Sequence, residues 1–165
     1  MHGLQTGNET KVHLCSADSE VSFETGIRIA LMALSDAYVV YIVDDDELVR
    51  KGLARLVRSG GFNPKGYESP ERFLDEIEPN TRACVLLDIT MPRMSGLQVQ
   101  ERLKARGSTM NIIVVSARDD DESRRRARQL DARCFFRKPV DDRALLDAIA
   151  WAMDAPSGAW NQSTG

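Results

Sequence analysis

Several features that mark whole classes of protein are scarce or missing in this chain. Its three cysteines are odd in number, and Cys84 and Cys134 fall in apolar runs, which does not suit a disulfide scaffold. No apolar stretch approaches the ~20 residues of a membrane span, and the start of the chain has no secretion signal pattern. The net charge of -3 gives no general attraction to a polyanion. We expect a cytoplasmic protein without membrane insertion or direct nucleic-acid binding.

The amino-acid composition fits one folded domain with extensions. Hydrophobic residues make up 42% and charged residues 28% of the 165 residues, close to averages for globular domains. Residues 38–153 form the organised part. Residues 1–37 are expected to be a disordered or loosely docked extension, with a short helix near Ile27–Leu34 left open. Residues 154–165 contain Gly, Ser and Pro and predict a flexible tail.

Short apolar runs alternate with amphipathic stretches from Tyr38 onward, which is typical of βαβ units in a parallel sheet. Pro64 places the second strand at a sheet edge, and the unbroken apolar run Ala83–Leu87 predicts a central strand. The expected strands are Tyr38–Val43, Phe62–Tyr67, Ala83–Leu87, Asn111–Ser116 and Cys134–Arg137. The expected helices are Asp46–Ser59, one opening at Ser69-Pro70-Glu71, one ending near Arg106, Asp121–Leu130 and Asp141–Met153.

The helix expected over Asp46–Ser59 is placed by its apolar spacing. Its apolar positions are Leu48, Val49, Leu53, Leu56 and Val57. The arginine cluster at residues 124–128 follows acidic residues within the helix Asp121–Leu130. Acids first and bases last match a helix dipole, so a solvated helix face is favoured over a partner-binding face.

Polar side chains follow the predicted strands at the points where these strands end. Asp44 and Asp45 follow the first strand, Asp88 the third, Ser116 ends the fourth, and Lys138 follows the fifth. Ligands of open parallel sheets bind outside the carboxyl ends of the strands. Grouped carboxylates suit a hard divalent cation, and Mg²⁺ prefers oxygen ligands. The sequence therefore predicts a cation site at one edge of the sheet.

A carboxylate beside a bound cation can attack phosphorus and form an aspartyl-phosphate. Lys138 and the metal would neutralise phosphoryl oxygens, while the Ser116 hydroxyl would bond a third one. Taken singly, each residue also has a plainer interpretation. Residues Asp44 to Asp46 could cap a helix, and the lysine and serine could be surface groups. The functional interpretation depends on all of them lying in register.

Four segments in this order resemble the receiver domain of two-component response regulators: VDDDELVR, LLDITMPRMSG, VVSARDD and FFRKPV. The resemblance covers about Tyr38–Met153. It implies an α/β fold, a doubly wound, flavodoxin-like (βα)5 arrangement with a five-stranded parallel sheet in the order 2-1-3-4-5. It also implies Mg²⁺-dependent acceptance of a phosphoryl group from a sensor histidine kinase or phosphotransfer protein, followed by slow hydrolysis.

The resemblance assigns a role to each matching residue of the acidic set. Asp88 becomes the phosphoacceptor. Asp45 would bind the metal directly, Asp44 mainly through water, and Thr90 through its backbone carbonyl. These assignments describe self-phosphorylation from a phosphodonor and autodephosphorylation rather than turnover of a substrate, so we expect no enzyme in the ordinary sense.

The resemblance also implies a switch. Ser116 and Lys138 would contact the phosphoryl group, and Phe135 occupies the position of a rotating aromatic residue. The fourth helix, fifth strand and fifth helix of the pattern would form the face that contacts a downstream protein or a second copy in a homodimer. Two departures are visible. Asp131 replaces a usual glycine, which Asp tolerates, and Arg118 leaves the phosphate lifetime open.

Three further functions stay open. A Mg²⁺-dependent phosphatase or phosphotransferase with an aspartate nucleophile would need an acid two residues after Asp88, where this chain has Thr90. A phosphate-independent interaction module would not need the intact acidic set. The short stretch after the last helix favours a single-domain regulator, although the chain also resembles receivers that form part of DNA-binding transcriptional regulators.

Overall fold

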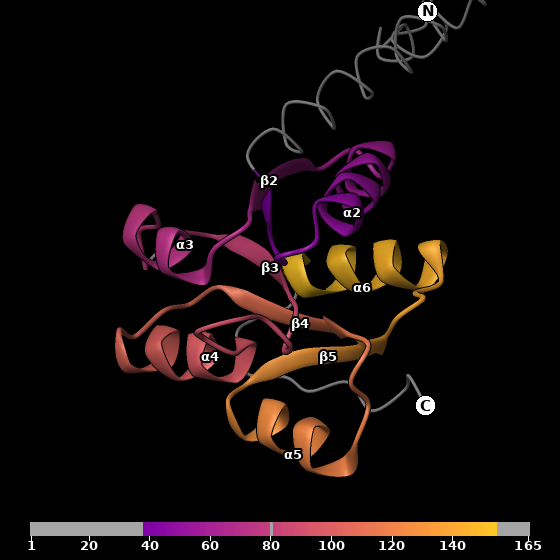
Figure 1. Cartoon of the computed structure of the whole chain (residues 1–165). Coiled ribbons are helices and arrows are strands. Elements are labelled where there is room, and N and C mark those ends of the chain that lie inside the picture. The colour runs from indigo at the N-terminus through magenta and orange to yellow at the C-terminus, as the bar shows by residue number, and fades with distance from the viewer. Residues whose placement is uncertain (1–37, 80, 155–165) are drawn as a thin grey trace, which may run out of the picture. The chain divides into compact units, whose positions relative to one another are not determined.

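The computed structural model describes residues 38–79 and 81–154, and it shows a parallel five-stranded sheet (Figure 1). The strand order is β2-β1-β3-β4-β5, which confirms the predicted order. The strands are β1 (Val39–Val43), β2 (Asn63–Tyr67), β3 (Ala83–Leu87), β4 (Asn111–Ser116) and β5 (Ala132–Arg137). Cys15 and the expectations for residues 1–37 and 155–165 lie outside the described residues.

Helices cover both faces of the sheet (Figure 1). One face carries α2 (Glu47–Ser59) and α6 (Asp142–Asp154). The other face carries α3 (Pro70–Glu76), α4 (Gly96–Ala105) and α5 (Asp121–Gln129). Each of these five helices begins after a residue whose side chain accepts a backbone N–H hydrogen bond, namely Asp46, Ser69, Ser95, Asp120 and Asp141.

The core consists of two apolar layers with β3 between them. All five residues of β3 are buried. Tyr41 and Phe73 belong to the layer beneath α3, α4 and α5, whereas Ile42 and Ile149 belong to the layer beneath α2 and α6. Cys84 and Cys134 are buried free thiols within the second layer. A strand covered on both faces needs an unbroken apolar run, which is why β3 was recognisable in the sequence.

Strand β2 lies at the edge of the sheet, as Pro64 predicted. The Asn63 N–H donates to the carbonyl of Tyr38, the residue just before β1, at 3.3 Å. Because successive residues of a strand face opposite neighbours, Pro64 and Gly66 direct their backbone groups away from β1. Proline has no N–H to leave unpaired there, so the edge loses one donor that another chain could bind.

Strand β5 begins at Ala132, two residues earlier than predicted. Asp131 adopts a left-handed conformation (φ 66°), so the chain turns directly from α5 into the strand. Arg133 concealed this start because a charged residue interrupts the apolar pattern. It is nevertheless buried, since its Nε donates to Asn111 Oδ1 at 2.9 Å and its guanidinium lies over the Trp151 ring. Tertiary partners thus replace the solvent that Arg133 would otherwise need.

Two details differ from the pattern read in the sequence. Leu48 is one of the residues at helical apolar spacing in α2, but its side chain is 80% exposed. It sits in the first turn of α2, beyond the edge of the apolar layer that buries Val57. Asp154 belongs to α6 rather than to the tail. Within the described ranges, no helix is long and apolar enough to cross a membrane.

Replacing either of two helical glycines by alanine should change the free energy of unfolding in opposite directions. A Cβ at Gly96 would lie 2.1 Å from the Asp88 carbonyl oxygen, and backbone cannot rotate out of the way. We expect Gly96→Ala to lower the free energy of unfolding by about 3 kcal/mol or more. Gly52→Ala is the control, because a Cβ there meets nothing within 4 Å. It should raise stability by about 0.5–1 kcal/mol. Urea denaturation of both variants measures this, and equal effects would contradict it.

Candidate functional site

The predicted site residues gather at the carboxyl ends of four strands. Asp44 and Asp45 follow β1, Asp88 follows β3, Ser116 ends β4, and Lys138 follows β5. Parallel pairing sets this arrangement, because Val43 lies opposite Leu87 and Ser116 lies opposite Arg137 in the registers. The structure therefore brings all five residues to one edge of the sheet.

Lys138 links two buried carboxylates. Its Nζ lies 2.6 Å from Asp44 Oδ2 and 3.7 Å from Asp88 Oδ2. Asp44 is 2% exposed and Asp88 is 6% exposed. The second oxygen of Asp44 accepts the Asp46 backbone N–H at 2.9 Å. Both oxygens of Asp44 are therefore already bonded, whereas the nearest ammonium contact of Asp88 is longer.

Three carboxylates form a cluster that suits a cation. One oxygen from each of Asp44, Asp45 and Asp88 lies within 4.8 Å of the other two, and Asp45 is exposed. An all-oxygen set that is partly open to water fits a hard ion such as Mg²⁺, which keeps several waters. Asp46 is separate from this cluster. Its side chain accepts from the backbone N–H groups at the start of α2, so helix capping applies to this residue of the triplet.

Burial raises the pKa of Asp88 above its ordinary value. The Lys138 ammonium opposes this effect, and the neighbouring Asp44 carboxylate adds to it. The Thr90 backbone N–H also donates to Asp88 Oδ1, at 3.2 Å. Asp88 thus sits in an environment where a nearby positive charge decides how readily its carboxylate stays ionised.

Ser116 is completely buried and ties the site to the neighbouring loops. Its hydroxyl accepts the Arg118 backbone N–H at 3.2 Å, and its carbonyl accepts the Lys138 backbone N–H at 3.0 Å. The second bond holds the end of β5 against the end of β4. A displacement of Ser116 would therefore move both the loop before α5 and the backbone of Lys138.

Phe135 is half-buried on β5 and packs against the apolar layer beneath α3, α4 and α5. The guanidinium of Arg124 lies 5.6 Å from the centre of its ring, and Arg124 also pairs with Asp119. Sequence reasoning missed this contact, because nothing in the local pattern connects α5 with β5. It also missed Arg50, whose Nη1 donates to the Asp44 carbonyl at 2.7 Å.

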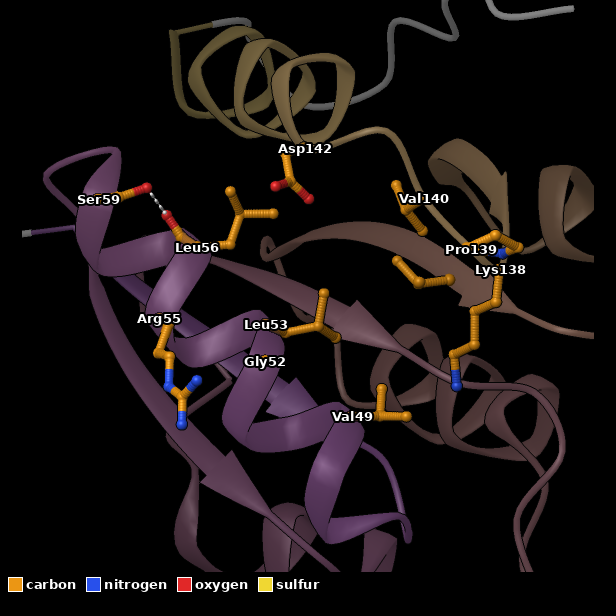
Figure 2. A pocket seen from close by; sticks show the side chains of 11 residues that line it. Val49, Gly52, Leu53, Arg55, Leu56, Ser59, Lys138, Pro139, Val140 and Asp142 are labelled. Carbon is orange, nitrogen blue, oxygen red and sulfur yellow. Dashed lines mark hydrogen bonds between the residues drawn. The ribbon is translucent and has the colours of Figure 1, made fainter.

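A groove of about 850 Å³ opens beside the site, between α2 and the segment that leads from β5 into α6. Figure 2 shows apolar side chains of Val49, Leu53 and Val140 lining it, with Lys138 and Pro139 at one end. The groove therefore reaches from the apolar side of α2 to the ammonium of the site. The sequence did not reveal it, since its walls come from segments about 90 residues apart.

This chain is similar in sequence to proteins of a known family. The family model "Response regulator receiver domain" matches residues 40–150. The response regulator protein TodT of Pseudomonas putida is 37% identical over 140 residues, which cover 84% of this chain and 60% of TodT. The transcriptional regulatory protein FixJ of Azorhizobium caulinodans is 36% identical over 116 residues, which cover 70% of this chain and 55% of FixJ.

Solved structures agree with these relatives. The structure of the response regulator StyR matches with a TM-score of 0.66 and 38% sequence identity, covering 70% of this chain and 59% of that chain. The match spans only 60% of TodT and 55% of FixJ, so their full activities are not transferred with it. The fold, the family match and the gathered residues agree, and the chain belongs to the response regulator receiver domain family, the signalling modules of two-component systems.

Proposed function

We propose that Asp88 accepts a phosphoryl group from a sensor histidine kinase or a phosphotransfer protein in the cytoplasm. The observation that carries this proposal is the grouping of Asp88 with a second buried carboxylate and one ammonium at the sheet edge. Asp88 is the member of this group with the longer lysine contact. Its Oδ1 accepts the Thr90 N–H at 3.2 Å and its Oδ2 lies 3.7 Å from Lys138, so neither oxygen has the short ammonium contact that holds Asp44.

The metal ligands follow from which oxygens are already bonded. Asp44 accepts hydrogen bonds at both oxygens, so it would act on Mg²⁺ mainly through water. Asp45 and Asp88 would bind directly, and Thr90 would add its backbone carbonyl. Bound there, Mg²⁺ would neutralise charge on the equatorial phosphoryl oxygens.

The transfer needs positioning more than covalent chemistry by the protein. An Asp88 oxygen forms the new bond to phosphorus as the bond to the donor's nitrogen or oxygen breaks. Lys138 stands ready to pair with one phosphoryl oxygen, and the Ser116 hydroxyl with another. Water attacking the same phosphorus would later return Asp88 to its free carboxylate, so the group is accepted and lost without turnover of a substrate.

The added charge would rearrange the contacts around Lys138. A phosphoryl group carries roughly -1.5 to -2 charges in phosphorylated hydroxyl side chains, and it offers strong acceptors. Lys138 would shift from Asp44 toward these oxygens, and Ser116 would move inward. Phe135 would then rotate toward the space that opens. The face formed by α5, β5 and α6 would change shape and bind a downstream protein or a second copy.

The apolar groove beside α2 gives the phosphodonor protein a place to dock. It ends at Lys138, so a helix seated in it lies next to the acceptor. Leu48, one residue before Val49 of the groove, adds an exposed apolar side chain in the first turn of α2. Exposed apolar groups beside a groove are typical of protein-binding surfaces.

A second function is favoured by the relatives. FixJ is named a transcriptional regulatory protein, and the matched regions span 55–60% of FixJ and TodT. The receiver described here would in that case control transcription through a DNA-binding partner or domain.

The phosphoacceptor is tested with acetyl phosphate and Mg²⁺. Intact mass spectrometry should show one added phosphoryl group, lost in Asp88→Asn and absent when a chelator removes the metal. An unmodified protein under saturating donor would overturn the proposal. Sustained turnover of phosphomonoesters would instead favour a phosphatase.

The metal assignment is tested with neighbouring carboxylates. Asp45→Asn removes a direct ligand and should raise the Mg²⁺ concentration for half-maximal phosphorylation by about tenfold or more. Asp46→Asn is the matched control, because asparagine caps a helix as well as aspartate does. It should leave the metal dependence unchanged. Equal Mg²⁺ titration curves for the two variants would refute the assignment.

The docking surface is tested with Leu48→Ser. Phosphotransfer from purified sensor kinases of the source organism should slow by about tenfold for the kinase that reacts fastest with the unaltered chain, since an apolar contact is lost. Uptake from acetyl phosphate should not change, because that donor needs no docking. If both rates fall together, Leu48 supports the fold or the site rather than the partner.

A further inference from the structure

A second groove lies on the other side of α2, between this helix and the edge strand β2. Its volume is about 320 Å³. Four cations and one acid contribute most of its lining: Arg50, Lys51, Arg55, Arg58 and Glu47. Figure 2 shows the Arg55 side chain pointing away from Val140 and Pro139, so Arg55 borders both grooves and its guanidinium lies far from the Lys138 end of the apolar one. The two sides of α2 thus differ in character, one apolar and one basic.

Two of these cations have no counter-ion within the part of the chain that the structure describes. Lys51 pairs with Glu47 at 2.6 Å, and Arg50 donates to the Asp44 carbonyl. Among residues 38–79 and 81–154, no carboxylate lies within ion-pair distance of Arg55 or Arg58. Both are exposed and three residues apart, so they share one face of the helix. Two guanidinium groups are therefore available to an external anion.

The edge strand adds a backbone donor to this groove. The Gly66 N–H faces away from β1, as the alternation along β2 requires. A Cβ at Gly66 would lie 3.8 Å from Arg50 Cδ, so the missing side chain leaves the backbone accessible beside the arginines. Pro64 offers no N–H at the preceding outward position. The edge therefore presents a single donor next to Arg50, rather than the row of donors that strand addition would need.

We propose that the groove between α2 and β2 docks an acidic segment of a protein partner. Carboxylates of that segment pair with Arg55 and Arg58, and a further oxygen accepts the Gly66 N–H. Guanidinium groups match carboxylates in geometry and are enriched at protein interfaces. A small ligand would need most of its surface buried, whereas this groove is lined by exposed side chains. A protein segment held by contacts outside the groove has no such requirement.

The net charge of the chain supports a protein partner over a nucleic acid. At -3 overall, the protein repels a long polyanion beyond the groove itself, while a short acidic segment meets only the local positive charge. Exposed charge pairs contribute mainly to encounter rate and specificity, so binding should weaken as salt rises. Binding in this groove does not require phosphorylation of Asp88. Its test can therefore fail while the phosphoacceptor proposal holds, and the reverse is also true.

The test uses a capped octaglutamate peptide as the probe and the full chain as the protein. We expect Arg55→Gln combined with Arg58→Gln to weaken binding at least tenfold at low salt. Arg125→Gln combined with Arg143→Gln is the control, because it removes the same charge from exposed positions on α5 and α6. It should weaken binding no more than twofold. In the unaltered chain, the NMR resonance of the Gly66 backbone amide should shift as the peptide is added.

Three outcomes would overturn the proposal. The first is that the unaltered chain binds no octaglutamate. The second is an equal loss of affinity in both double variants, which would show an effect of net charge alone. An eight-nucleotide single strand that binds more tightly than the peptide, and depends on the same two arginines, would assign the groove to nucleic acid. Circular dichroism melting of both double variants checks that neither substitution pair has unfolded the domain.

Discussion

The ion pair between Lys138 and Asp44 is the interaction on which the site depends. It joins the end of β5 to the end of β1 across β3 and β4, at 2.6 Å, in a region where Asp44 is almost fully buried. Removing one partner of such a pair generally leaves an uncompensated buried charge. The pair also occupies one oxygen of Asp44, which leaves Asp88 as the buried carboxylate with the looser lysine contact.

Two strands that are not neighbours can be connected this way because the sheet is parallel and doubly wound. Every strand then ends at the same edge, and the helices leave that edge uncovered. Gly96 shows how tightly the surroundings are built, since α4 begins so close to the Asp88 backbone that no side chain fits. The same packing that buries the carboxylates also limits where a phosphoryl group and a metal can sit.

Much of this was readable from the sequence because it depends on local patterns. The apolar run of β3, the proline of β2 and the capping residues Ser69 and Asp46 each act within a few residues. Prediction failed where a distant partner decided the outcome. Arg133 looked like a break before β5, but Asn111 and Trp151 bury it. Leu48 shares the helical apolar spacing of α2, but the apolar layer stops short of it and the side chain is exposed.

The sequence by itself determined the order of the elements and the residue types at the strand ends, because hydrophobic periodicity and terminal polar groups are properties of neighbouring residues. It also determined which family the chain resembles. Tertiary structure alone decided that both oxygens of Asp44 are engaged, that Arg124 lies over Phe135, and that α2 separates an apolar groove from a basic one. These features join segments far apart in the chain, whose distances only the folded packing sets.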